Sequence, residues 1–396
     1  MTQTSHSEVV IVGFARTPIG SFQGALSSLT APKLGAHAIK AALERAGVKP
    51  EQVSEVIMGN VLTAGIGQAP ARQATIFAGI PSSVPALTIN KVCGSGMKAI
   101  MLGVQSIMTG ESEIVVAGGQ ESMTNAPYLM PAARSGFRMG NSSVVDSMIH
   151  DGLWDPYNNQ HMGNCGDLCA KEMHFSREEQ DAFATESFKR AQAAQASGKF
   201  KSEIAPISIA GKGEAVVVEN DEGPAKVKFD KIPTLKPVFD KNGTITAANA
   251  STINDGASAV VLMSAEKAKA MGLKPLAKIV SQATFAQDPV WFTTAPAGAM
   301  KKALEKANWK VSDVDLFEVN EAFGVVTMAS MKELNIPHEK MNVYGGAISL
   351  GHPIGSSGSR IVITLINALK DKGLKKGLAG ICIGGGEATA VAVELL

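Results

Sequence analysis

The chain has 396 residues, with 37 basic and 36 acidic side chains and a net charge of +1, so no strong field draws it toward nucleic acid or an anionic membrane. Its 40 glycines, 45% hydrophobic content and 5% aromatic content are typical of an α/β enzyme and exclude a disordered or fibrous protein. The N-terminal sequence has no signal-peptide pattern, and no apolar run approaches a membrane span, so we expect a cytoplasmic, soluble protein.

Strands and helices alternate in the first part of the chain. Apolar runs expected to form strands lie at 9–13, 53–59, 87–90 and 113–119, and helices are expected at 36–46 and directly after Cys93. This alternation predicts a parallel sheet that helices cover. The second helix has apolar residues at spacings of three and four from Met97 to Val104, which is the stripe of a helix packed on a sheet. Its first turn should therefore lie beside Cys93.

The alternation breaks down in the middle of the chain. From 122 to 249 a polar helix and lysine-bearing extended stretches indicate an inserted loop domain. Ser176 and Glu179 form a capping-box pattern, so the polar helix should begin near Ser176. We therefore expect an N-terminal half-domain of 1–121 and 250–273, an inserted domain of 122–249, and a C-terminal half-domain of 274–396.

The two outer parts of the chain resemble each other in sequence. The stretch ALERAGVKPEQVSEVIMG at 42–59 reappears as ALEKANWKVSDVDLFEVN at 303–320, and the glycine-rich turn and helix after Cys93 correspond to those around Gly355. Such a repeat predicts two similar half-domains. Packing them about a pseudo-twofold axis would bring His352, in the second glycine-rich turn, near Cys93.

Cys93 is the first candidate for catalysis. It follows a short strand and precedes a helix, where free N–H groups and the helix dipole stabilise a thiolate. Gly94 and Gly96 leave space for a substrate carbonyl to approach. The alternative interpretation is a small buried hydrophobic residue at a tight turn.

Three further polar residues occupy matching places in the second half. His352 could serve as the base that a cysteine nucleophile needs, or could be a solvated turn residue. Cys382 precedes three glycines whose N–H groups can bind an anion, although it could also be a buried strand cysteine. Asn320 ends a strand, where a buried amide must find hydrogen-bond partners.

One further cluster of possible ligands could indicate a zinc site. His161, Cys165 and Cys169 recur every four positions, but a fourth ligand is not evident and His174 lies off their face. We therefore expect no metal site. The four cysteines are also too few and too scattered for a disulfide framework.

Taken together, the segments NKVCGSG, EVNEAF, GHPIGSSGSR and CIGGG, in this order on duplicated halves, resemble the thiolase family over the whole chain. The resemblance implies an α/β protein with the thiolase fold, in which two duplicated βαβαβαββ half-domains form a five-layered α/β/α/β/α arrangement with an inserted loop domain. Within the family, the chain is most similar to the biosynthetic acetyl-CoA acetyltransferases.

The resemblance also assigns roles. It makes Cys93 the nucleophile that accepts the acyl group, His352 the group that activates it, and Cys382 the acid/base for the α-proton of the second acetyl-CoA. Asn320, through a water, would join His352 in one oxyanion hole. The backbone N–H groups of Cys93 and Gly384 would form the other.

The resemblance implies substrate contacts as well. Ser251 would contact the pantetheine arm, His161 and Met162 would line the acyl end of the pocket, and Ala322 and Phe323 would form its wall. Two regions depart from the family. The stretch at 221–227 lacks the usual CoA-binding arginine, so we expect Lys226 or Lys228 to take its place. The second departure concerns larger residues near the acyl pocket, Trp291 and Phe292.

The implied reaction is a reversible ping-pong condensation of two acetyl-CoA to acetoacetyl-CoA and CoA, with no cofactor beyond these thioester substrates, in a homotetramer built as a dimer of dimers. The main alternative is a degradative 3-ketoacyl-CoA thiolase for longer chains. A decarboxylating ketoacyl synthase would lack Cys382, and a lipid-binding relative without activity would be expected to lose one of Cys93, His352 or Cys382.

Overall fold

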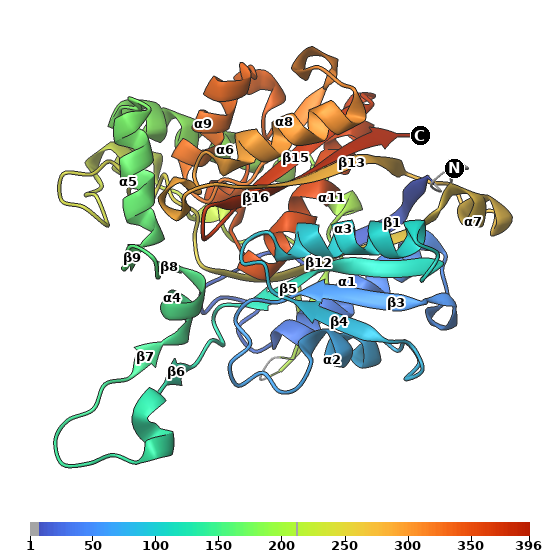
Figure 1. Ribbon diagram of the computed structural model, residues 1–396, viewed down its shortest axis with the longest axis horizontal. Helices are drawn as coiled ribbons and strands as arrows, with labels where there is room; N and C mark the ends of the chain where they lie inside the picture. The colour runs from blue at the N-terminus through green and yellow to red at the C-terminus, as the bar shows by residue number, and fades with distance from the viewer. Residues whose placement is uncertain (1–7, 211–212) are drawn as a thin grey trace.

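The computed structural model describes residues 8–210 and 213–396, which form one large mixed sheet with helices on both faces (Figure 1). The first half of the sheet holds five strands in spatial order: β1 (Val9–Arg16), β12 (Asn254–Ser264), β5 (Ile114–Ser122), β3 (Glu55–Gly59) and β4 (Ala86–Ile89). The second half holds four: β13 (Ala277–Ala286), β16 (Glu387–Leu395), β15 (Lys376–Ile383) and β14 (Leu316–Val319). The two halves join where β1 pairs with β13.

The central strands bury side chains on both faces, and this creates the layers. In β1, Val9 and Ile11 pack into one apolar cluster while Val10 and Val12 pack into another. The clusters contain different helices: α3 (Ser95–Met108) and α11 (Ile354–Lys372) between the half-sheets, α1 (Ala31–Ala46) and α2 (Pro70–Phe77) outside the first, and α8 (Ala295–Ala307) and α9 (Gly324–Leu334) outside the second. The expected five-layered arrangement is confirmed.

The prediction of a parallel sheet is wrong for much of the molecule. Only the β4–β3–β5 set and the β14–β15 pair are parallel, and the other main strand pairs are antiparallel. The reason is the connections: β15 turns into β16 through residues 384–386, which is too short for a parallel crossover. The alternation of strands and helices ends before these returning strands.

The inserted segment carries its own small elements. Its long helix α6 (Arg177–Ala196) begins where the capping box predicted: Ser176 Oγ accepts from Glu179 N at 3.1 Å and Ser176 N donates to Glu179 Oε2 at 2.8 Å. The other strands and α-helices of this segment are β6 (Tyr128–Leu129), β7 (Val145–Asp146), α4 (Ser147–Gly152), β8 (Trp154–Asp155), β9 (Gln160–His161), α5 (Met162–Glu172), β10 (Ile207–Ile209) and β11 (Val216–Val218). Three short elements lie outside it: β2 (Gly20–Ser21), α7 (Ala265–Ala270) and α10 (Ala347–Leu350).

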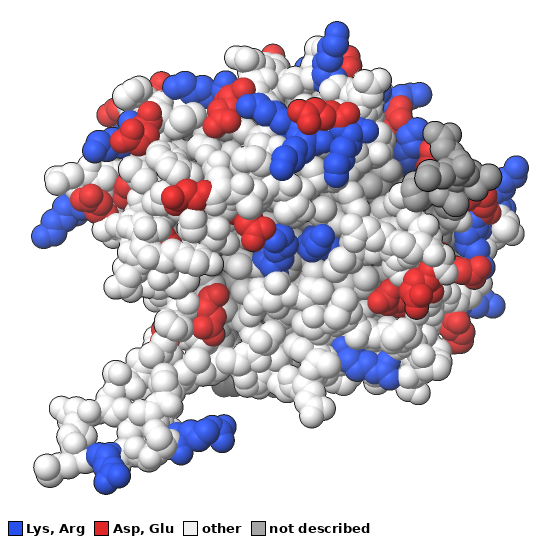
Figure 2. Space-filling model, in the orientation of Figure 1, with Lys and Arg blue, Asp and Glu red and all other residues white. Residues whose placement is uncertain are grey.

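The surface is mixed in charge, with acidic and basic side chains interspersed over the face in Figure 2, in keeping with the net charge of +1. Within the described ranges, no helix combines the length and hydropathy needed to cross a membrane.

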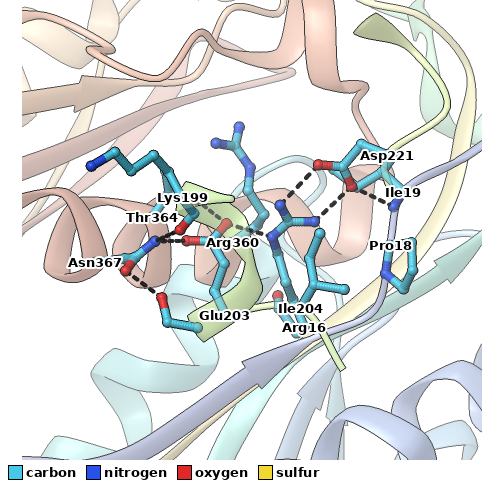
Figure 3. Close-up of polar contacts among 12 residues, drawn as sticks. Arg16, Pro18, Ile19, Lys199, Glu203, Ile204, Asp221, Arg360, Thr364 and Asn367 are labelled. Atoms are coloured by element: carbon cyan, nitrogen blue, oxygen red, sulfur yellow. Dashed lines mark hydrogen bonds and ion pairs between the residues drawn. The ribbon is translucent and has the colours of Figure 1, made fainter. Parts of the chain in front are cut away.

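A buried ion cluster fastens the inserted segment to both half-domains (Figure 3). Arg16, at the end of β1, donates to Glu203 Oε1 at 2.6 Å and to both oxygens of Asp221 at 2.7 and 2.9 Å. Glu203 also accepts from Asn367 and Thr364 of α11, at 3.0 and 3.2 Å. Since all three ions are almost fully buried, loss of one partner would leave an unpaired charge in the interior.

Candidate active site

The two central helices begin side by side and carry the two candidate catalytic turns. Cys93 lies two residues before α3, and His352 lies two residues before α11. A Cβ added to Gly96 would lie 2.5 Å from Ser359 Oγ, and one added to Gly358 would lie 2.5 Å from Met97 N. Only glycine permits this contact at both helix starts, so the turns are held close together, as the repeat predicted.

Cys93 lies in a strained and tightly bonded turn. The preceding Val92 has a φ of 44°, which is rare for a β-branched residue, and Asn90 Oδ1 accepts from its backbone N at 2.9 Å. Burial raises the pKa of Cys93 to about 11, while N–H groups of Gly384 and of Cys93 itself act in the opposite direction. Burial therefore outweighs the expected stabilisation of the thiolate, and the thiol needs a base.

Cys382 is completely buried near the end of β15. Burial raises its pKa well above the usual value, and the charge of Cys93 adds to this effect, so the two sulfur atoms lie within electrostatic range of each other. The turn of Cys93 is also tied to this strand end, because Lys91 Nζ contacts Glu387 Oε2 at 2.5 Å across the 384–386 turn. A thiol with a raised pKa becomes a strong base once it is deprotonated.

His352 is buried, and hydrogen bonds fix both its backbone and its ring. Its backbone N donates to Asn254 Oδ1 at 2.9 Å, and its Nδ1 lies 2.6 Å from Ser357 Oγ. Burial, with a smaller contribution from the positive charge of Arg360, lowers the pKa of the imidazole to about 3. Its Nε2 has no hydrogen-bond partner within the described part of the chain. The ring is therefore neutral, with one nitrogen left to react.

Asn320 presents a second set of unused polar atoms. It follows β14, and its backbone N donates to Gly380 O at 3.1 Å on β15, two residues before Cys382. The side chain is fully buried, and neither its Oδ1 nor its Nδ2 has a partner among residues 8–210 and 213–396. A buried amide without partners costs free energy. We infer that a water or a substrate atom completes its hydrogen bonds.

A cavity of about 660 Å³ is lined largely by the inserted segment and by residues 250–253, and its lining includes none of the four candidate catalytic residues. Ser251 lines it, and Ser251 N donates to Ala322 O at 3.0 Å. Phe239, also in its wall, stacks on His161 at 4.5 Å between ring centroids and meets the edge of Phe323 at 6.1 Å. Sequence positions 251, 322 and 323 are thus brought together beside Asn320.

The remaining predicted contacts are placed as follows. A Cβ on Gly384 would lie 3.7 Å from Met162 Cε, so Met162 packs on the glycine turn after Cys382. Phe292 is buried and meets Phe323 at 6.3 Å, whereas Trp291 is only partly buried. His161 caps α5 instead of lying on its face, accepting from Gly163 N at 3.1 Å, so it does not share a helical face with Cys165 and Cys169.

Sequence reasoning missed several residues that hold this site. Glu121, near the end of β5, accepts four hydrogen bonds around the catalytic turns, and Asn60 is one of its donors. Ser357 and Asn254 fix His352. The sequence offers one signal for Glu121, which lies near the end of the apolar run IVVAGGQES. A carboxylate at the end of a buried strand must either be buried with partners or be functional.

Comparison with known proteins gives a consistent result. Residues 9–266 match the family described as "Thiolase, N-terminal domain", and residues 273–395 match "Thiolase, C-terminal domain". The acetyl-CoA acetyltransferase of Cupriavidus necator is 56% identical over 98% of this chain and 99% of its own length. Acetyl-CoA acetyltransferase B, mitochondrial, of Xenopus laevis is 55% identical over 98% of this chain and 92% of its own.

Solved structures agree. The Acat5 thiolase of Ascaris suum, in complex with coenzyme A, has a TM-score of 0.94 and 45% identity, covering 98% of this chain and all of its own. The acetyl-CoA acetyltransferase of Bacillus anthracis has a TM-score of 0.96 and 42% identity, with 99% of each chain covered.

Proposed function

The chain belongs to the thiolase family, and on that premise we propose how it works as an acetyl-CoA C-acetyltransferase, joining two acetyl-CoA into acetoacetyl-CoA and CoA. The observation that carries the proposal is the close approach of the helix starts that follow Cys93 and His352, with Cys382 within electrostatic range of Cys93. It is supported by the neutral, buried imidazole of His352 and by the Asn320 amide, which lacks partners within the described residues. Condensation needs one sulfur to hold the acyl group and a separate base to form the carbanion equivalent.

In the first half-reaction His352 Nε2 takes the proton of Cys93, and the sulfur attacks the acetyl carbonyl of acetyl-CoA. The N–H groups of Cys93 and Gly384 stabilise the oxyanion, an assignment supported by their effect on the Cys93 pKa. As the carbon–sulfur bond to CoA breaks, the CoA sulfur takes the proton of Cys382. This leaves acetyl-Cys93, a protonated His352 and the Cys382 thiolate.

In the second half-reaction the Cys382 thiolate removes an α-proton from a new acetyl-CoA. The enolate oxygen is stabilised by His352 Nε2–H and, through a water, by Asn320. The enolate carbon attacks the acetyl group, acetoacetyl-CoA forms, and the departing Cys93 sulfur takes its proton back from His352. Both thiols are regenerated, so the proton count closes over the cycle.

We expect the CoA phosphates to meet lysines at the cavity wall, in place of the family's arginine. Lys226 and Lys231 have carboxylates nearby, Glu222 at 3.8 Å and Asp230 at 3.4 Å. Lys228 has no carboxylate within 4.0 Å in the described chain. Its charge is therefore the least neutralised of the three, and we assign it the main phosphate contact.

Two separate apolar surfaces support a homotetramer. An arm over residues 124–146 projects from the body (Figure 1), is largely uncharged in Figure 2, and exposes Phe137 and Met139. The other surface includes Phe77 of α2 and Leu87 of β4, the last strand in the sheet order. Two self-complementary surfaces suffice to build a dimer of dimers. A stable, active monomer in sedimentation experiments would contradict the homotetramer. The cytoplasmic location stays a prediction.

The substrate proposal is tested by chain length. Phe292 meets Phe323, and Met162 packs on the Gly384 turn. We expect these bulky side chains to close the acyl end of the pocket and so to favour a short acyl group. Thiolysis of acetoacetyl-CoA should have a much higher kcat/KM than thiolysis of 3-ketoacyl-CoA with eight or more acyl carbons. Comparable values for both would favour the degradative alternative.

A further inference from the structure

Glu121 is a buried acid to which the proposed reaction assigns no step. It lies in β5 with 0% of its surface exposed, between the turn that follows β3 and the start of α11. Its Oε1 accepts from Asn60 Nδ2 at 2.7 Å and from Leu62 N at 3.1 Å. Its Oε2 accepts from Val61 N at 3.0 Å and from Gly355 N at 2.9 Å. Both oxygens are therefore fully used.

Neutral N–H donors, and no positively charged side chain among the described residues, stabilise the charge of Glu121. No Lys, Arg or His side chain of the described residues forms an ion pair with it. Burial raises the pKa of this carboxyl to about 7, and the four donated hydrogen bonds act in the opposite direction. A carboxylate that accepts this many bonds from rigid backbone groups fixes the relative positions of the segments that donate them.

Those segments carry the catalytic turns. Val61 and Leu62 belong to the same apolar cluster as Cys93 and Ile354, so the 60–62 turn packs behind the nucleophile. Gly355 is in the first turn of α11, three residues after His352. A Cβ at Gly355 would lie only 2.7 Å from Glu121 Oε2, so the carboxylate rests directly on the helix start. Glu121 thus links the N-terminal half-domain to the turn of the base.

We propose that Glu121 is a positioning residue that fixes the His352 turn relative to Cys93 and places a negative charge behind the turn of Cys93. The proposal rests on the assignment of Cys93 as nucleophile. The charge of Glu121 is among the causes that raise the Cys93 pKa, which agrees with the second part. Cys382 is a further titratable group within electrostatic range of Cys93, and the Lys91–Glu387 ion pair begins two residues before Cys93 in the chain. Lys98, on α3, interacts with the charges of that pair.

Two variants separate the geometry from the charge. Glu121→Gln keeps the size but removes the charge and turns an NH2 group toward N–H donors. Glu121→Asp keeps the charge but cannot reach all four donors. The readouts are kcat for condensation and the pH midpoint of Cys93 alkylation by iodoacetamide, with the alkylated residue identified by mass spectrometry.

We expect kcat to fall roughly ten-fold or more in both variants. The alkylation midpoint should move to lower pH in Glu121→Gln alone, so that this variant has more thiolate and yet turns over more slowly. A residue with a merely structural role would not raise the thiolate fraction. Asp255→Asn is the matched control, since Asp255 is equally buried on neighbouring β12 and binds Ser122 and Thr124 instead; its midpoint should stay at the wild-type value.

Wild-type kcat in both variants would overturn the positioning role, and an unchanged midpoint in Glu121→Gln would overturn the role of the charge. If Glu121→Gln does not fold, the Asp variant still tests the geometry. Acetylation of wild-type Cys93 by acetyl-CoA is measured in parallel. Its absence would overturn the proposed function, whereas its presence with unchanged variants would overturn only this inference.

Discussion

Asn60 and Asn320 each directly follow the corresponding strand of their half-domain, one position apart in the repeat alignment, and they meet opposite surroundings. Each follows the corresponding strand, β3 or β14, and donates its backbone N to a neighbouring strand, to Ile89 O at 3.0 Å and to Gly380 O at 3.1 Å. The side chain of Asn60 is bonded to Glu121 at 2.7 Å, whereas that of Asn320 has no partner in the described chain. The amide of Asn60 is therefore satisfied within the protein, whereas the amide of Asn320 is available to bind a ligand.

The same division of labour applies to the turns before the central helices. The first half-domain places a thiol there, Cys93, and the second an imidazole, His352. Duplication therefore supplies two equivalent corners, and chemistry arises because the residues in them differ. The side-chain amide that forms hydrogen bonds within the protein in the first half-domain is left to bind substrate in the second.

The largest difference is expected between the two asparagines. Asn320→Ala should lower kcat for condensation by roughly 10²- to 10³-fold, because it removes an oxyanion contact, with little loss of stability, since the amide has no described partner to lose. Asn60→Ala should lower the free energy of unfolding by about 1–3 kcal/mol, because it takes a donor from the buried Glu121. Steady-state kinetics and thermal unfolding of both variants decide the matter. The reverse pattern would break the comparison.

A smaller effect is expected at the support of His352. Ser357→Ala removes the group 2.6 Å from Nδ1 and should lower kcat roughly ten-fold, because the orientation and tautomer of the ring are then less well fixed. Ser359→Ala is the control: Ser359 is an equally buried hydroxyl of α11 that bonds Ser258 at 2.6 Å. Equal losses of kcat in both variants would show that Ser357 acts only through packing.

The smallest effect concerns the cavity wall. Lys228→Ala should raise KM for acetyl-CoA by up to about five-fold, the range of an exposed charge contact of about 0.2–1 kcal/mol, with kcat unchanged. Lys226→Ala should have less effect, because Glu222 lies 3.8 Å from its Nζ. The rise should shrink at high salt. A larger effect from Lys226 would reassign the phosphate contact.

The two half-domains and the candidate reactive groups could be predicted from the sequence. The repeat predicted two half-domains, and glycine-rich turns marked Cys93, His352 and Cys382, because such turns are needed wherever backbone approaches substrate or a second helix. These roles stay predictions until tested. Glu121 and Ser357 could not be found in the same way, since the importance of Glu121 depends on partners 59 to 234 positions away and that of Ser357 on a side-chain rotamer, which no local pattern records.

The central claim is that the two sulfurs belong to different steps, and intact-mass measurement after mixing with acetyl-CoA tests it most directly. Cys93→Ala should carry no acetyl group, because the covalent acceptor is gone. Cys382→Ser should still become acetylated while its condensation rate falls by roughly 10²- to 10⁴-fold, since a hydroxyl replaces the base. An acetyl adduct on Cys93→Ala, or full condensation activity in Cys382→Ser, would show that the nucleophile or the base has been assigned to the wrong sulfur.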